Sequence, residues 1–263
     1  MFHRIVGAAA WFVIAFILAP LVVITAGSFT TAPVVNFPPT GFTLDWYAQL
    51  LGRRDFLESF VDSVLIALWC TGAATLLGVA AAIGLHRHRF VGHAAFRAFV
   101  ISPLVLPTVV TGVALLQFYN VAHLDMPFTE LVIGHVLITI PYVVRTVGAG
   151  LIGMDPAIEE AAESLGARPA RVLLKVTLPA IAPSILSSTV FVFITSFDQV
   201  TISVFLSSPD LMPLPVRIYT YIDFSIDPMI AAVSTVLIGF AFLVLAILQK
   251  VLGLDRAFGA GQI

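Results

Sequence analysis

Long apolar windows are the feature of this sequence that most constrains its fold. Crossing about 30 Å of hydrocarbon at a rise of about 1.5 Å per residue takes about 20 residues. Only 11% of the residues are charged, well below the ~25% of soluble domains. We therefore predict an all-α integral membrane protein, a single transmembrane domain over 1–263. Its six expected spans are 5–27, 63–85, 98–119, 131–151, 183–206 and 229–251.

The basic residues predict an orientation. If the amino terminus lies in the cytoplasm, ten of the 13 Lys and Arg residues fall on the cytoplasmic side. The positive-inside rule favours this arrangement, with both termini and the connection 152–182 in the cytoplasm. The ten are Arg4, Arg87, Arg89, Arg97, Arg145, Arg168, Arg171, Lys175, Lys250 and Arg256, against Arg53, Arg54 and Arg217 outside.

Proline and glycine mark the spans that we expect to pack inside a bundle. Pro103 and Pro107 interrupt the third window and Pro141 interrupts the fourth. Each proline removes a backbone hydrogen bond that neighbouring helices or water must replace. Close helix contact is predicted at three glycines of the second window, Gly72, Gly78 and Gly84.

One polar stretch, GMDPAIEEAAESLGARP at 153–169, stands between the fourth and fifth windows. Asp155 is a good N-cap, Pro156 suits the first helical position, and Gly166 can end a helix in a left-handed conformation. This predicts a short helix of about ten residues. Pro169 then restarts a helix that is expected to end at Leu178-Pro179.

The short helix is predicted to have an apolar and an acidic face. Ile158, Ala161, Ala162 and Leu165 form the first, and Glu159, Glu160 and Glu163 lie on or beside the second. Such a helix could lie on the lipid surface, because the basic residues that follow it suit anionic headgroups. It could equally enter a groove of a soluble partner. The residues alone leave both uses open.

The spacing of the stretch resembles a known family. Glu160-Ala161-Ala162, Gly166, Val176 and Leu178-Pro179 follow the order EAA, three residues, Gly, nine residues, an aliphatic, one residue, Leu-Pro. This order resembles the EAA loop of permease subunits of binding-protein-dependent ABC importers, with Val176 at the usual isoleucine. The resemblance implies a type I importer permease (MetI-like) fold with a cytoplasmic coupling helix between the fourth and fifth spans.

The resemblance also implies roles for the residues of the loop. Glu160 would pair with a basic residue of an ATP-binding subunit, the two alanines would allow close approach, and Gly166 would form the turn. The residues implied to contact that subunit are Glu159, Glu160, Ala161, Ala162, Glu163, Gly166, Leu178 and Pro179.

The resemblance extends over most of the chain. GFTLDWYAQLL at 41–51, IPYVVRTVGAGLIGMDP at 140–156 and the segment 196–222 are similar to the subfamily that includes the second permease of spermidine/putrescine importers. We therefore expect a polyamine as the solute. Opines, 2-aminoethylphosphonate and other small organic solutes are the alternatives, since the subfamily also serves them.

No phosphate-binding loop occurs in the sequence. Both lysines, Lys175 and Lys250, lack the preceding glycines that cradle phosphates. The chain is therefore expected to be a non-catalytic subunit without a cofactor of its own, and ATP and Mg²⁺ would be used by a partner. The resemblance implies two copies of an ATP-binding subunit, a second related permease and an extracytoplasmic substrate-binding protein, in a bacterial inner membrane. No nucleic acid partner is expected.

Asp198 and Gln199 fall within the fifth window, in the outer half of the membrane. An ionisable residue there costs about 2.5 to 3.5 kcal/mol on insertion scales and usually faces a bundle interior or a water-filled cavity. We predict that Asp198 lines the solute pathway, with Gln199, Thr195 and Thr201 nearby. A bond to a neighbouring helix, or a gate against a second permease, would explain Asp198 equally well.

Tyr219, Tyr221 and Asp223 are expected in an outer loop before the sixth span. An aromatic pair beside a carboxylate could hold an ammonium group by cation-π contact. Tyrosines near a membrane interface also form the ordinary aromatic belt, which the residue pattern favours.

The histidines of HRHRFVGH at 86–93 are not predicted to bind a metal. His86, His88 and His93 have no carboxylate or cysteine beside them, and the charges of Arg87 and Arg89 repel cations. A basic cytoplasmic turn is the simpler interpretation.

Two other classes of membrane protein compete with the permease. An ion-coupled secondary transporter would be expected to show inverted repeats or several buried ionisable residues, and little of either is present beyond Asp198 and Arg145. A membrane scaffold would not need the spacing of the EAA stretch.

Overall fold

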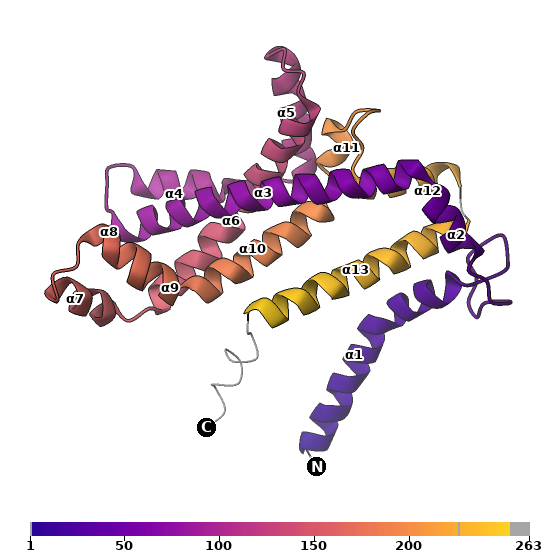
Figure 1. Cartoon of the computed structure of the whole chain (residues 1–263), viewed down its shortest axis with the longest axis horizontal. Coiled ribbons are helices and arrows are strands. Elements are labelled where there is room, and N and C mark those ends of the chain that lie inside the picture. The colour runs from indigo at the N-terminus through magenta and orange to yellow at the C-terminus, as the bar shows by residue number, and fades with distance from the viewer. Residues whose placement is uncertain (1, 226, 253–263) are drawn as a thin grey trace. The chain divides into compact units, whose positions relative to one another are not determined.

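The computed structural model describes residues 2–225 and 227–252, and its regular elements there are helices (Figure 1). This confirms the all-α prediction for the described residues. The chain forms two compact units, Met1–Glu58 with Arg217–Ile263, and Ser59–Val216. That the two units together form a single transmembrane domain stays a prediction.

The first unit combines the two ends of the chain. In it α13 packs against α1 and α2. The side chains of Trp11, Phe12 and Phe16 on α1 are each more than two-thirds exposed, as expected for a helix that meets lipid or another subunit. The helices of this unit are α1 (Phe2–Gly27), α2 (Asp45–Gly52), α13 (Met229–Leu252) and, from Arg217, most of α12 (Leu214–Phe224).

The second unit is built around α3, α6 and α10. One apolar cluster includes Cys70 of α3, Val143 of α6 and Val192 of α10, and a second includes Ile66 of α3 and Ile138 of α6. Its helices are α3 (Arg54–Arg87, from Ser59), α4 (His93–Ile101), η1 (Ser102–Leu104), α5 (Thr108–Val121), α6 (Pro127–Gly153), α7 (Pro156–Ser164), α8 (Pro169–Val172), the π-helix η2 (Leu173–Thr177), α9 (Leu178–Ala180), α10 (Ala182–Phe197) and α11 (Ser203–Leu206).

Three described helices are long and apolar enough to cross a membrane, α1, α3 and α6. They match the first, second and fourth predicted spans, and α3 and α6 extend beyond them. If each of two bent helix pairs forms one span, the number rises to five. The sixth window corresponds to α13. The count of six membrane spans and the cytoplasmic location of both termini stay predictions. Asp255 and Arg256 lie outside the described residues.

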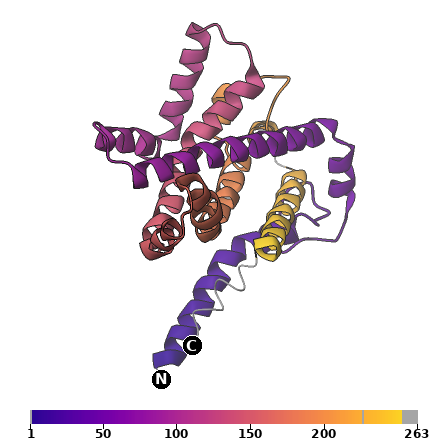
Figure 2. The ribbon, with the colours of Figure 1, turned by 60° about the vertical axis from the view of Figure 1, so that its left-hand side comes forward.

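The third window, 98–119, is interrupted where its two prolines predicted, and whether the bent pair forms one span stays a prediction. The chain bends by 103° between the segments His93–Leu104 and Thr108–Val121, and Figure 2 shows α5 leaving α4 steeply. Pro103 and Pro107 lie at this bend, where neither can donate a backbone hydrogen bond. Pro141, by contrast, is buried inside an uninterrupted α6.

Glycine allows α3 and α6 to approach closely at one of the three predicted positions. A Cβ atom on Gly78 would lie 2.6 Å from Cβ of Val143 on α6. A Cβ on Gly72 or Gly84 would meet no atom within 4 Å. The contact prediction is therefore confirmed for Gly78 and wrong for the other two within the described chain.

Candidate functional site

The polar stretch forms the predicted short helix. Asp155 is the N-cap of α7, where its Oδ1 accepts a hydrogen bond of 2.9 Å from the backbone N–H of Ala157. Pro156 occupies the first helical position. Since proline has no N–H to leave unsatisfied there, the two residues together start the helix.

Gly166 ends α7 in a left-handed turn. Its φ is 82°, its N–H donates to the carbonyl of Glu163 at 2.8 Å, and the N–H of Ala167 donates to the carbonyl of Ala162 at 3.1 Å. This pair of bonds is the Schellman arrangement, which favours glycine because a Cβ is strained at such a φ. The predicted turn at Gly166 is confirmed.

Glu159 faces inward, where it holds α7 to the carboxyl end of α3. Its Oε1 lies 2.5 Å from Nη2 of Arg87 and also accepts from the hydroxyl of Thr177. The same Nη2 donates to Thr177 Oγ1 at 2.8 Å. Thr177 is fully buried, and the side chains of Arg87 and Glu159 are each 25% exposed. We call these three residues the Arg87 clamp.

The Arg87 clamp was not predicted from the sequence. Glu159 was grouped with the partner-facing acidic residues, and Arg87 was assigned only to a basic turn. One signal was available, because Glu159 and Ala162 are three residues apart and therefore share a helix face. These two are the half-buried residues of α7, whereas its other residues are exposed.

The remaining surface of α7 is free in the described part of the chain. Glu160 and Glu163 form no ion pair with a described residue, and Ile158 and Leu165 are 49% and 89% exposed. We call Ile158, Glu160, Ala161, Glu163 and Leu165 the docking face of α7. It combines exposed apolar side chains with two carboxylates, as a surface for a basic protein partner would.

The helix that Pro169 restarts ends at Ala180, one residue beyond the predicted Leu178-Pro179. Leu178 begins α9, and the break comes later, at Ile181, where the segments Pro169–Ala180 and Ala182–Phe197 meet at 66°. Before Pro179 the helix widens into the π-helix η2, in which the N–H of Leu178 reaches back to the carbonyl of Leu173. Leu178 is half-buried and Pro179 is exposed.

Asp198 lies at the end of α10, so the fifth window, 183–206, is not one continuous helix, and its role as a span stays a prediction. Asp198 is the exposed C-cap of α10, and α11 begins only at Ser203. Gln199 Oε1 accepts from the backbone N–H of Thr201 at 3.1 Å. Thr195 and Thr201 are half-buried. Of the four predicted pathway residues, Thr195 lies on α10, and Asp198, Gln199 and Thr201 lie in the break before α11.

A histidine that the sequence analysis did not select holds this break in place. His135 on α6 is 1% exposed. Its Nδ1 lies 2.8 Å from Ser196 Oγ and its Nε2 lies 2.9 Å from Ser203 Oγ. Ser203 already donates its proton to the carbonyl of Gln199 at 2.6 Å, so the proton of the imidazole belongs on Nε2. The signal in the sequence was a titratable side chain in the fourth apolar window, which also contains Arg145.

The aromatic residues before the last helix lie on α12 and not in a loop, which corrects a further prediction. The hydroxyl of Tyr221 donates to Asp227 Oδ2 at 2.6 Å, and Arg53 lies 5.5 Å from its ring centroid. Arg53 therefore already occupies the cation-π position that was proposed for a solute. Tyr219 and Asp223 are exposed.

Charged contacts reinforce this cluster in the first unit. Arg53 forms two hydrogen bonds with Asp55, of 2.9 and 2.8 Å. Burial raises the pKa of the Tyr221 hydroxyl. The sites predicted from 195–201 and from 219–223 belong to different units.

No group of three or more His, Cys, Asp or Glu side chains that could hold a metal ion occurs among the described residues. His93 instead lies with Nε2 2.9 Å from the carbonyl of Leu85.

Solved structures share this fold. The chain aligns with a bacterial ABC transporter involved in the import of the acidic polysaccharide alginate, with a TM-score of 0.74 over 95% of each chain at 17% identity. It also aligns with the MetNI methionine ABC transporter, with a TM-score of 0.61 over 73% of this chain and 91% of that one at 15% identity.

Curated relatives and a family model match most of the sequence. The chain is 29% identical over 248 residues to the spermidine/putrescine transport system permease protein PotC of Shigella flexneri, covering 94% of this chain and 93% of that protein. It is 34% identical over 232 residues to the putrescine transport system permease protein PotI of Escherichia coli K12, covering 85% and 82%. The model for the binding-protein-dependent transport system inner membrane component matches residues 74–255. The chain therefore belongs to the family of inner membrane permease components of binding-protein-dependent ABC importers.

Proposed function

We propose that this permease forms half of the translocation pathway of an ATP-driven importer of a polyamine, putrescine or spermidine. The relatives at 29% and 34% identity are permeases of spermidine/putrescine and putrescine systems. A polyamine is a flexible cation at neutral pH, and the exposed carboxylate of Asp198 at the break after α10 suits such a solute.

The proposed coupling role is based on a difference between the two faces of α7. The docking face is exposed, whereas the inner face is bound to the rest of the unit. Glu160 and Glu163 have no ion pair among the described residues, whereas Glu159 is bound in the Arg87 clamp. A partner that binds the docking face would therefore pull on α3 through Arg87 and on the segment before α10 through Thr177. This arrangement favours partner docking over an amphipathic helix that lies loosely on lipid.

The partner would be an ATP-binding subunit, present twice in the complex and supplying ATP and Mg²⁺. Glu160 would pair with a basic residue of that subunit, and Ala161 would let the two surfaces approach closely. Closure of the two ATP-binding subunits would then move α7 and, as a rigid body, the helices joined to it. A second permease would complete the pathway, and an extracytoplasmic binding protein would deliver the solute.

Uptake measurements test the solute. The chain would be produced with its neighbouring transporter subunits in cells that lack polyamine import, and uptake of labelled putrescine, spermidine, 2-aminoethylphosphonate and an opine would be compared. We expect ATP-dependent uptake of a polyamine that unlabelled polyamine competes away. Uptake of the aminophosphonate or the opine without a polyamine would contradict the polyamine assignment and leave the coupling role intact.

A further inference from the structure

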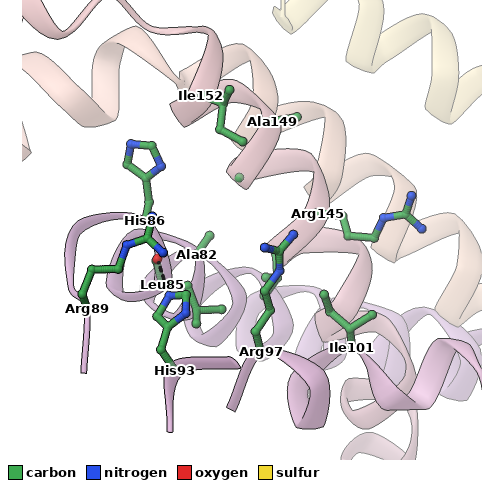
Figure 3. A pocket seen from close by; sticks show the side chains of 12 residues that line it. Ala82, Leu85, His86, Arg89, His93, Arg97, Ile101, Arg145, Ala149 and Ile152 are labelled. Atoms are coloured by element: carbon green, nitrogen blue, oxygen red, sulfur yellow. Dashed lines mark hydrogen bonds between the residues drawn. The ribbon is translucent and has the colours of Figure 1, made fainter. Parts of the chain in front are cut away.

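A basic pocket lies at the same end of α3 as the Arg87 clamp. It has a volume of about 470 Å³ and is formed by α3, α4, α6 and the turn that joins α3 to α4 (Figure 3). All its lining residues belong to the second unit. The pathway residues at the end of α10 do not line it, and the proposed coupling and transport roles do not use it.

Positive charge dominates the lining of this pocket. Arg89, Arg97 and Arg145 contribute three guanidinium groups, His86 and His93 add two imidazoles, and the lining contains no Asp or Glu. None of the three arginines forms an ion pair or a side-chain hydrogen bond with a described residue. Figure 3 shows Arg89 and His93 side by side with Arg97 beside them, whereas the side chains of His86 and Arg145, which also line the pocket, extend away from this group.

Three exposed arginines on the lining of one pocket give it a positive potential that attracts anions. Guanidinium groups present forked donors that match the oxygens of phosphate, and they are often used for phosphate recognition for this reason. The same charges repel a polyamine, so this pocket does not suit the proposed solute. Its chemistry fits a phosphate-bearing anion.

The surroundings of the pocket identify the source of the phosphate. The pocket lies where α3 and α6, two helices long enough to cross the membrane, approach their ends at Arg87 and Gly153. The lining also includes an exposed apolar side chain, Ile152, which is 77% exposed. A basic pocket beside exposed apolar surface at the membrane boundary suits a headgroup whose acyl chains lie against the helices.

We propose that Arg89, Arg97 and Arg145 bind the phosphate of an anionic phospholipid on the cytoplasmic side of the membrane. The bound headgroup neutralises the three guanidinium groups. Its acyl chains cover the exposed apolar side chain of Ile152 at the end of α6. The lipid thus stabilises the junction of α3, α4 and α6, next to the end of α3 that carries Arg87.

The test measures lipid binding to the full purified chain in detergent by native mass spectrometry, with phosphatidylglycerol and phosphatidylcholine as the two lipids. The pocket variant carries Arg89→Gln, Arg97→Gln and Arg145→Gln. The control variant carries Arg54→Gln, an exposed arginine outside both the pocket and the basic stretch after α7, and it is compared with the single pocket variant Arg97→Gln. A common elution volume and helical content verify that the variants are folded.

We expect the wild type and the control to bind phosphatidylglycerol at least about tenfold more tightly than phosphatidylcholine, and the pocket variant to lose this preference. If the pocket variant does not fold, Arg97→Gln is compared with Arg97→Lys, and only the first should lose most of the preference. A preference that survives in the pocket variant, or falls as far in the control as in Arg97→Gln, overturns the proposal. Tight binding of inorganic phosphate without any lipid preference assigns the pocket to a free phosphate compound and overturns the lipid assignment.

Discussion

At the scale of single residues, α7 separates two kinds of glutamate. Glu159 is bound by Arg87 and Thr177, whereas Glu160, its neighbour in sequence, is exposed. Successive residues of a helix point about 100° apart, so neighbours can serve different surfaces. The inner residue fixes the helix to its own chain, and the outer one remains exposed.

The Arg87 clamp predicts a measurable coupling energy. Arg87→Gln and Glu159→Gln should each destabilise the purified chain, because each leaves a half-buried charged group without its partner. The double variant should cost less than the sum of the two, by about 1 kcal/mol. Thermal unfolding in detergent of the wild type, both single variants and the double variant gives this energy. Strictly additive effects would show that the two side chains do not stabilise each other.

Residue-level prediction succeeded where backbone conformation limits the choice of residue. Asp155, Pro156 and Gly166 have local roles at helix ends, so their positions could be assigned from the sequence. Arg87 and Thr177 could not be assigned, because they are 90 positions apart and meet only through packing. The docking role of Glu160 and the pathway role of Asp198 stay predictions.

At the scale of elements, the sequence predicted which windows are helical better than where they bend. Pro141 lies in an unbroken α6 where packing buries it, whereas the segment with Pro103 and Pro107 turns by 103°. The local effect of proline is the same in each case. The surrounding tertiary contacts decide whether the helix continues, and a single sequence does not reveal them. The break after Phe197 was missed for the same reason, since His135 from another helix bonds to both sides of it.

Close packing of α3 on α6 gives a prediction with a matched control. Gly78→Ala should destabilise the chain by about 1 to 3 kcal/mol, because its Cβ would meet the branched side chain of Val143 at 2.6 Å. Gly72→Ala on the same helix should be neutral or stabilising, because alanine is the better helix former and nothing lies within 4 Å. Thermal unfolding in detergent measures both. Equal effects of the two substitutions would contradict close packing at Gly78.

At the scale of the whole molecule, the chain is apolar and has no phosphate-binding loop. We therefore expect a partner subunit to supply the energy for transport. Membership of the importer family is shown by the match over residues 74–255. The proposed energy path enters at the docking face of α7 and passes through the Arg87 clamp. The lipid pocket lies next to that path and would stabilise the helix ends on which it acts.

Transport coupling in the assembled importer tests whether the docking face of α7 transmits ATP hydrolysis to uptake. The complex would be reconstituted in proteoliposomes with its ATP-binding subunits, second permease and binding protein, and uptake and ATP hydrolysis would be measured together. The variants are Glu160→Lys on the docking face and Glu58→Lys, the same charge change at an exposed position outside α7. We predict that Glu160→Lys lowers uptake by more than about tenfold and abolishes stimulation of ATP hydrolysis by the loaded binding protein, while Glu58→Lys leaves both near wild type. Normal uptake by a correctly inserted Glu160→Lys permease would contradict the account.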